Sequence, residues 1–265
     1  MKQLSPSDQT RLFRNLLTRV GYGNPHAPVW FIGIEDGGEG WTATEENRRV
    51  LEAWGPATQL ESYPAPAWRI CQKSIGYDRR TRKCDGRKGT KIYRYMDYVV
   101  SGGRNTSWNP CGMSLVDASG RNTYFQMNLY PLARPNTRTW PRDNEVLFGF
   151  APSREDRQRY ADVVRLERFK ILRDYWQDKE HHPVLTVCFG KTFWPDYRHL
   201  FGLREQDQQK VPGTDGRIVY YPEQRIARTP FFNPCQLGAP RNLKPLLKYL
   251  TNFGVSVAPN AYLQL

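Results

Sequence analysis

Four short segments of this chain share one pattern, in which an apolar run ends at a polar or glycine-containing turn. The segments are residues 31–40, 125–135, 184–190 and 231–237. Apolar runs of this length are typical of buried strands, and the turn after a strand of an α/β sheet opens into a ligand crevice. We therefore expect the functional residues to lie where these strands end.

Helical and strand patterns alternate along the chain. We expect helices over residues 7–20, 42–54 and 241–253, and strands over residues 28–34, 124–129, 184–189, 218–221 and 225–229, the last two as strands or as a hairpin. Another helix begins near Ser153, with Asp156 three positions later as in a capped start. Its apolar stripe is expected in the core: Val163, Leu166, Phe169, Leu172 and Trp176. The alternation favours one α/β domain over residues 1–265, with three αβα layers and a mainly parallel central sheet.

The charge balance indicates a polyanionic partner. The 265 residues include 39 Lys and Arg against 26 Asp and Glu, for a net charge of +13. Basic surfaces gain affinity for nucleic acid by releasing counterions from phosphates, although the same charge also serves solubility. No segment reaches the roughly 20 apolar residues of a membrane span, and the first residues lack the apolar core of a signal peptide. We expect a cytoplasmic monomer without membrane contact.

The cysteines give no sign of a disulfide framework, because the five are an odd number without regular spacing. We expect reduced thiols. A metal or iron–sulfur site formed by Cys71, Cys84 and Cys111 is conceivable, but the chain contains no paired C-x-x-C motif. The sequence therefore predicts neither a metal nor another cofactor.

A long segment at about residues 62–115, between the first two expected strands, combines cations with aromatic rings. Its central cations are predicted to contact DNA: Arg79, Arg80, Arg82, Lys83, Arg87 and Lys88. The interleaved aromatic residues are Trp68, Tyr77, Tyr93, Tyr95, Tyr98 and Trp108. Cations hold a phosphate backbone while aromatic rings stack on bases, which suits nucleic acid. The alternative is a solvated insertion whose tyrosines pack locally.

The four segments resemble the uracil-DNA glycosylase superfamily in content and in order. Its first strand leads into a glycine-containing turn, which residues 33–38 resemble. Its second strand ends in an asparagine with Arg-Pro further on, as at Asn128 and residues 134–135, and its third ends in glycine, as at Gly190. The late motif of the mismatch-specific branch is Asn-Pro-Ser, and residues 233–235 read Asn-Pro-Cys. Four motifs in the family's order are more specific than any one of them.

The resemblance implies that a nucleotide is flipped out of DNA, its base is held in a pocket, and water cleaves the N-glycosidic bond. Glu35 falls where the family places the residue that positions this water. A carboxylate there also stabilises the positive charge that develops on the sugar. Asp36 replaces the usual proline, either as a second carboxylate or to stabilise the turn. The alternative for Glu35 is a strand-end carboxylate that caps a neighbouring helix.

Four further residues are candidates for the site. By the resemblance, Asn128 reads the Watson–Crick edge of the flipped pyrimidine, and Asn233 stabilises the oxygen anion of the departing base. Leu237 fills the vacated stack as a wedge, and Trp41 stacks on the extruded base. The structural alternatives are a turn asparagine at Asn128, an apolar loop anchor at Leu237 and helix-start packing at Trp41.

The departures from the family pattern bear on the substrate. Strict uracil enzymes place a bulky tyrosine shortly after the catalytic residue, whereas this chain has Gly37 and Gly38. The smaller side chains admit a larger base, such as the glucosylated hydroxymethylcytosine that an anti-phage branch of the superfamily excises from viral DNA. Glycine pairs also occur in turns for conformational reasons. We expect a glycosylase for a bulky 5-substituted pyrimidine, acting on duplex DNA.

Three other functions remain open. One is a uracil or mismatch repair glycosylase. The second is a non-catalytic nucleic-acid-binding module, which the net charge and the missing His and Pro of the usual motifs favour. The third is a metal-dependent nuclease in which Glu35, Asp36 and Glu39 coordinate magnesium. Base release in EDTA separates a glycosylase from such a nuclease.

Overall fold

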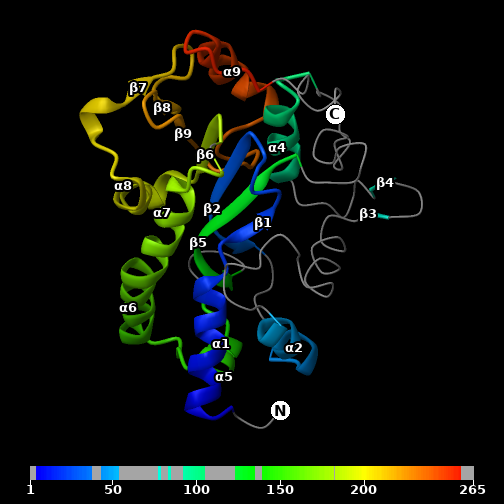
Figure 1. Ribbon diagram of the computed structural model, residues 1–265, viewed down its shortest axis with the longest axis vertical. Helices are drawn as coiled ribbons and strands as arrows, with labels where there is room; N and C mark the ends of the chain where they lie inside the picture. The colour runs from blue at the N-terminus through cyan, green and yellow to red at the C-terminus, as the bar shows by residue number, and fades with distance from the viewer. Residues whose placement is uncertain are drawn as a thin grey trace.

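A seven-stranded sheet forms the centre of the protein in the computed structural model (Figure 1). The structure describes residues 4–37, 43–53, 77–78, 83–84, 92–104, 123–134, 139–181 and 183–257. The strands, in their order across the sheet, are β1 (Gly21–Gly23), β5 (Phe125–Arg134), β2 (Val29–Gly37), β6 (Leu185–Phe189), β9 (Ile226–Thr229), β8 (Val219–Tyr221) and β7 (Gln209–Lys210). The four strands β5, β2, β6 and β9 run parallel. The expected α/β class is confirmed.

Both edges of the sheet are antiparallel. β1 pairs with β5 in the antiparallel sense, and β8 and β7 extend the sheet antiparallel beyond β9. Residues 218–221 and 225–229 therefore form a hairpin rather than separate strands. The expected parallel arrangement holds for the central strands only. The short strands β3 (Tyr77–Asp78) and β4 (Lys83–Cys84) form a separate antiparallel pair.

Helices cover both faces of the sheet, so the fold has three layers (Figure 1). The first face packs against α1 (Pro6–Thr18), α5 (Asp143–Phe148), α6 (Arg154–Val163), α7 (Phe169–Gln177) and α8 (Trp194–Phe201). The second face packs against α4 (Ile92–Val100) and α9 (Lys244–Thr251). α2 (Glu45–Ala53) lies beside α1. No helix of the described residues is long and apolar enough to cross a membrane.

Alternating side chains of the strands supply the two cores. In β2, Trp30 and Ile32 belong to the core under α1, whereas Val29 and Phe31 belong to the core under α4 and α9. Every residue of β6 is buried. A strand that is covered on both faces carries apolar side chains on both of them, which explains why these strands form continuous apolar runs in the sequence.

Two predicted helix starts are confirmed, and the closing helix is shorter than expected. The hydroxyl oxygens of Ser5 and Ser153 accept hydrogen bonds from the backbone N–H groups of Asp8 and Asp156, as N-caps of α1 and α6. A 3₁₀ turn, η5 (Pro240–Leu243), precedes α9. The helix expected over residues 241–253 therefore begins as a 3₁₀ turn.

The expected core stripe of the long helix is wrong at one position, because Leu166 is 77% exposed. A π-turn, η2 (Val164–Arg168), separates α6 from α7. A π-turn holds more residues than an α-turn, so it rotates the helix faces relative to a regular 3.6-residue pattern. The buried face accordingly passes through Val164 and Arg168, while Phe169 and Leu172 are buried as expected.

Candidate functional site

The candidate site lies where the winding of the sheet reverses. β2 is the first of the four parallel strands along the chain; β5 follows on one side of it and β6 on the other. Ligands of such sheets bind at the carboxyl ends of the strands beside this switch point. The register places Asn128 beside Gly33, and the pairing of β2 with β6 ends at Ile32 and Cys188. Three of the four sequence segments therefore meet at one edge.

Tyr197 of α8 occupies the point where β2 and β6 separate. Its hydroxyl lies 3.0 Å from the carbonyl oxygen of Ile32 and 3.0 Å from that of Phe189, and its side chain is buried. Burial raises the pKa of this phenol well above its usual value, so the hydroxyl remains a neutral donor. It serves two strand-end carbonyl groups and links the two strands at the crevice.

The Asn128 side chain lies against Gly33. A methyl group on Gly33 would lie 2.4 Å from Asn128 Oδ1 and 3.0 Å from Cζ of Phe189. Such close approach is possible here because glycine has no Cβ. Asn128 is only 2% exposed, so its amide is withdrawn from bulk solvent. The strand does not end at this asparagine as expected, because β5 continues to Arg134. An amide offers both a donor and an acceptor to a ligand.

A buried arginine fixes the backbone of Asn128. Nη2 of Arg168 donates to the carbonyl oxygen of Asn128 at 2.8 Å, and Nε donates to that of Leu129 at 3.0 Å. Nη1 donates to the carbonyl oxygens of Leu17 and Arg19, at 2.7 and 2.5 Å, where α1 ends. The guanidinium thus ties β5 to the end of α1, and the sequence analysis missed this residue. No local pattern signalled it, because Arg168 is not one of the residues of the expected apolar stripe.

Gly190, at the end of β6, permits a second close approach. Its φ is +114°, and a methyl group on it would lie 2.6 Å from Cδ1 of Ile34 and 3.7 Å from Cδ2 of Phe231. The third sequence segment thus touches both the first and the fourth. Glycine is favoured at this position by the backbone conformation as well as by the lack of space.

The fourth segment contributes Phe232 to a stack of three aromatic rings. Phe232 stacks on Phe189, with ring centroids 4.8 Å apart, and on Tyr95 of α4, at 5.3 Å. The hydroxyl of Tyr95 donates to the carbonyl oxygen of Gly238. Stacked rings bury much apolar surface and restrict the loop that they support. The loop after β9 is therefore anchored to α4 at the same edge of the sheet.

Asn233 has a structural role in this loop. Its Oδ1 accepts a hydrogen bond from the backbone N–H of Gln236 at 2.7 Å, and its carbonyl oxygen accepts from the N–H of Leu237 at 3.0 Å. These bonds form a capped turn, so Oδ1 is engaged. Nδ2 donates no hydrogen bond to any other described residue, and it is the donor that Asn233 can offer to a ligand.

Leu237 is arranged as a loop anchor rather than as an exposed wedge. Its side chain is 3% exposed and belongs to the core under α9. Its carbonyl oxygen accepts a hydrogen bond from Nδ2 of Asn242 at 2.8 Å. In this conformation the apolar-anchor alternative accounts for Leu237, because burial of its side chain stabilises the turn after Asn233.

The predicted carboxylates Glu35 and Asp36 lie near the end of β2, and the structure describes only their backbone. The backbone of Glu35 pairs in register with Tyr130, and β2 continues through Asp36 and Gly37. Gly38 and Trp41 lie outside the described residues. The catalytic role of Glu35 and the stacking role of Trp41 therefore stay predictions.

The predicted DNA contacts of the long segment also fall largely outside the described residues. This applies to Arg79, Arg80, Arg82, Arg87 and Lys88, whereas the backbone of Lys83 is part of β4. Two of its aromatic residues, Tyr95 and Tyr98, are not exposed rings on which bases could stack, because each is only 2% exposed. They form the apolar face of α4 and pack in the core, as the local-packing alternative proposed.

Possible metal ligands and the histidines also bear on the chemistry of the site. Among the described residues, no three His, Cys, Asp or Glu side chains are grouped as metal ligands. Glu39, Cys71 and Cys111 lie outside these residues, so the magnesium and iron–sulfur hypotheses stay untested. The described histidines pack elsewhere: His181 lies beside Trp30 and His26, and His199 lies beside Phe169.

Comparison with known proteins adds no relative. No family model matches the sequence, and no curated protein matches it either. Function is therefore inferred from the residues of the site, from their contacts and from the charge of the chain.

Proposed function

We propose that this protein is a DNA glycosylase of the uracil-DNA glycosylase type, which flips out and hydrolyses a pyrimidine nucleotide with a bulky 5-substituent. The observation that carries the proposal is the convergence of the four sequence segments at the sheet's switch point. Asn128 lies against Gly33, and Gly190 lies against Ile34 and Phe231. Motifs far apart in the sequence meet where an α/β sheet binds its ligand.

Base recognition is assigned to Asn128. Its buried amide has a donor and an acceptor, which together complement the Watson–Crick edge of a pyrimidine. The two hydrogen bonds from Arg168 and Gly33's lack of a side chain fix where this amide lies. A preorganised polar group loses less entropy when it binds a base.

Hydrolysis is assigned to Glu35, which follows Gly33 by two residues in β2. Water adds to C1′ of the sugar as the bond from C1′ to the base nitrogen breaks. Glu35 orients the water and takes its proton, and the base departs as an anion. Nδ2 of Asn233 is the neutral donor offered to that anion, and Asp36 is a second carboxylate beside the sugar.

We assign the selection of substrates by the size of their base to Gly37 and Gly38. Neither residue has a side chain that excludes a substituent at C5 of the pyrimidine. A glucosylated hydroxymethylcytosine in phage DNA is the substrate we propose to test first. An enzyme for that base acts in defence against phage, whereas release of uracil indicates repair.

The test is base release from two DNAs in EDTA, measured by mass spectrometry. Purified protein is incubated with uracil-containing duplex DNA and with phage DNA that carries glucosylated hydroxymethylcytosine. We expect release of the glucosylated base and at least a 100-fold slower release by Glu35→Gln, the size of a lost general-base contribution. The matched control is Glu223→Gln, an exposed glutamate in the β8–β9 turn, which we expect to retain activity.

The alternative of a non-catalytic binding module has its own supporting observation. The described histidines lie away from the site, and Oδ1 of Asn233 is engaged within its loop. A binding module releases no base from either DNA but still binds DNA after Glu35→Gln. Absence of release together with intact DNA binding would therefore favour the module over the enzyme.

A further inference from the structure

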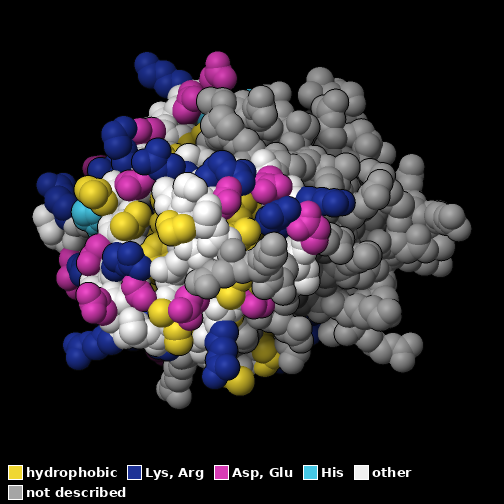
Figure 2. Space-filling model, turned by 90° about the horizontal axis from the view of Figure 1, so that it is seen from below, with side chains coloured by type: hydrophobic (Ala, Val, Ile, Leu, Met, Phe, Trp, Pro, Cys, Tyr) yellow, Lys and Arg dark blue, Asp and Glu magenta, His cyan; other side chains and the backbone are white. Residues whose placement is uncertain are grey.

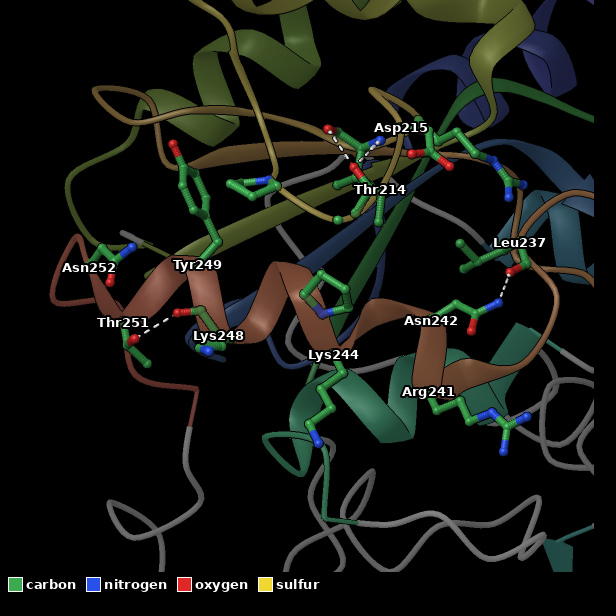
Figure 3. Close-up of a pocket in the computed structure, with 15 residues that line it drawn as sticks. Thr214, Asp215, Leu237, Arg241, Asn242, Lys244, Lys248, Tyr249, Thr251 and Asn252 are labelled. Atoms are coloured by element: carbon green, nitrogen blue, oxygen red, sulfur yellow. Dashed lines mark hydrogen bonds between the residues drawn. The ribbon is translucent and has the colours of Figure 1, made fainter.

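A basic groove lies beside the candidate site. It has a volume of about 880 Å³ and runs between α9 with η5 and the turn that joins β7 to β8 (Figure 3). Because Val219 of β8 pairs with Arg228 of β9, this turn lies at the edge where β9 ends. Leu237, in the loop that follows β9, also lines the groove. The groove and the site therefore share one loop.

The charges of the groove are mostly of one sign. Four cations line it, namely Arg217, Arg241, Lys244 and Lys248, together with one carboxylate, Asp215. All four are exposed, and none forms an ion pair with another described residue. Figure 3 shows Arg241 and Lys244 extending from the rim of the groove, away from Thr214.

Charges are arranged differently at the end of the molecule formed by α1 and α2. There, Arg11 pairs with Asp8 and Glu52, and Arg48 pairs with Glu45. In the view from below, Lys and Arg side chains alternate with Asp and Glu (Figure 2). Paired charges cancel at a distance, whereas unpaired cations around a groove create a local positive potential.

The neutral polar residues of the groove hold its walls together. Thr214 Oγ1 donates to the carbonyl oxygen of Val211 at 2.7 Å, and Asn242 Nδ2 donates to that of Leu237 at 2.8 Å. The Tyr249 hydroxyl donates to Oε1 of Gln209 at 2.6 Å. These groups bond within the protein, whereas the side chains of the four cations form no hydrogen bond or ion pair with another described residue. Such a lining suits a ligand recognised by negative charge more than by base-specific hydrogen bonds.

The spacing of the cations fits a chain of phosphates. Arg241, Lys244 and Lys248 follow at i, i+3 and i+7, which places them along one side of a helical segment about 10 Å long. Successive phosphates of one DNA strand are several ångströms apart, so cations spread over this length can contact neighbouring phosphates of the same strand.

We infer that this groove holds the phosphodiester backbone of the DNA strand next to the flipped nucleotide. Its identification as a DNA site rests on the proposed function, while its affinity for a phosphate chain rests on the groove alone. The contacts are sequence-independent, so they strengthen binding to DNA whether or not it carries a modified base.

The test compares two triple variants of the full chain. The groove variant carries Arg241→Gln, Lys244→Gln and Lys248→Gln. The control variant carries Arg142→Gln, Arg154→Gln and Lys179→Gln, which removes the same charge from exposed residues that form no ion pair with another described residue. Binding of a fluorescein-labelled, unmodified DNA duplex is measured by anisotropy between 50 and 200 mM NaCl.

We expect the groove variant to bind at least tenfold more weakly, and its slope of log Kd against log salt to fall by up to about 2.7, for three lost phosphate contacts. The control is expected to change Kd less than about threefold. Equal effects of the two variants, or an unchanged slope in the groove variant, would overturn the inference. Tighter binding of duplex RNA than of DNA would overturn the assignment to DNA.

Base release measured in parallel separates this inference from the proposed function. If the groove variant loses affinity and no DNA yields a free base, the groove is a phosphate-binding site on a protein that is not a glycosylase. If bases are released and the groove variant binds as the control does, the enzyme is established and the groove has another role. In an active enzyme, the groove variant is expected to raise KM for DNA.

Discussion

At the scale of single residues, the approach of Asn128 to Gly33 leaves no room for a side chain on this glycine. We predict that Gly33→Ala slows base release at least about tenfold, because the added methyl group would lie 2.4 Å from Asn128 Oδ1 and must displace the amide. Overpacking of this kind costs about 1–3 kcal/mol of the free energy of unfolding. Base release and urea-induced unfolding are both measured for the variant.

Gly202→Ala is the matched control for that substitution. Gly202 ends α8 with φ +63°, and a methyl group on it meets nothing within 4 Å. The alanine costs about 1 kcal/mol through backbone strain but leaves the site unchanged. If both variants lose base release in proportion to their stability, the contact between Gly33 and Asn128 has no special role in the site.

The sequence identified some residues of the site better than others. Asn128 became a candidate because the motif that runs to Arg134 and Pro135 begins at it, and the register places it beside Gly33 near the switch point. The roles of Tyr197 and Arg168 depend on carbonyl groups far away in the chain, which no local pattern contains. The sequence could not decide whether Leu237 is a wedge or a loop anchor, because an apolar residue in a loop is compatible with both roles.

At the scale of secondary-structure elements, Arg168 joins α1 to β5. We predict that Arg168→Met lowers the free energy of unfolding by about 3 kcal/mol or more, since the buried carbonyl groups of both elements lose a charged donor. Arg168→Lys is expected to recover only part of this loss, because an ammonium group lacks the planar fork of the guanidinium. Urea unfolding measures both variants.

The control for Arg168 is Arg154→Met, at an exposed position of α6 that makes no described hydrogen bond through its side chain. Its expected effect is within about 0.5 kcal/mol. An Arg168→Met protein as stable as this control would show that the guanidinium bonds contribute nothing net to stability, as happens where the cost of desolvating a buried charge offsets them.

The π-turn η2 gives a second prediction for the same helical region. Leu172 is fully buried, whereas Leu166 is 77% exposed. We expect Leu172→Ala to cost about 2–5 kcal/mol of the free energy of unfolding and Leu166→Ala less than about 0.5 kcal/mol. Urea unfolding of the two variants decides between the π-turn and a regular helix, since a regular helix with the stripe read from the sequence makes both losses large.

Long periodic elements were predictable, and interruptions of the period were not. The central strands follow from apolar runs with two covered faces, and the start of α6 follows from the serine cap at Ser153. A π-turn leaves no mark in a pattern of 3.6 residues, so Leu166 was assigned to the wrong face. Short elements such as β1 and β7 hold too few residues for any periodicity.

At the scale of the whole molecule, the net charge of +13 favours a polyanionic partner but does not say where such a partner would bind. A net charge does not say where the cations lie. The ion pairs near α1 show that several cations are already neutralised by neighbouring carboxylates. The groove beside α9 is formed by residues 212–252, which are separate in the sequence from the basic aromatic segment. Only the fold brings its cations into one place.

Burial across the molecule also sets its response to alkali. Burial raises the pKa of several tyrosine phenols, most strongly at Tyr197, and it raises that of the Cys188 thiol. In the unfolded chain these groups lose their protons near pH 9–10, while the folded chain keeps them. The unfolded state then binds fewer protons, so the free energy of unfolding is undiminished at pH 8 and falls as the pH rises above 9.

Urea unfolding between pH 7 and 10.5 tests this prediction. Each fully buried phenol contributes a slope of at most about 1.4 kcal/mol per pH unit above its unfolded pKa. Tyr197→Phe is expected to be less stable by about 1–3 kcal/mol at pH 7, since the carbonyl groups of Ile32 and Phe189 lose their donor, but to fall less steeply with pH. A variant with the unaltered slope would mean that Tyr197 ionises as easily in the folded protein as in the unfolded chain, which a phenol sealed between β2 and β6 should not do.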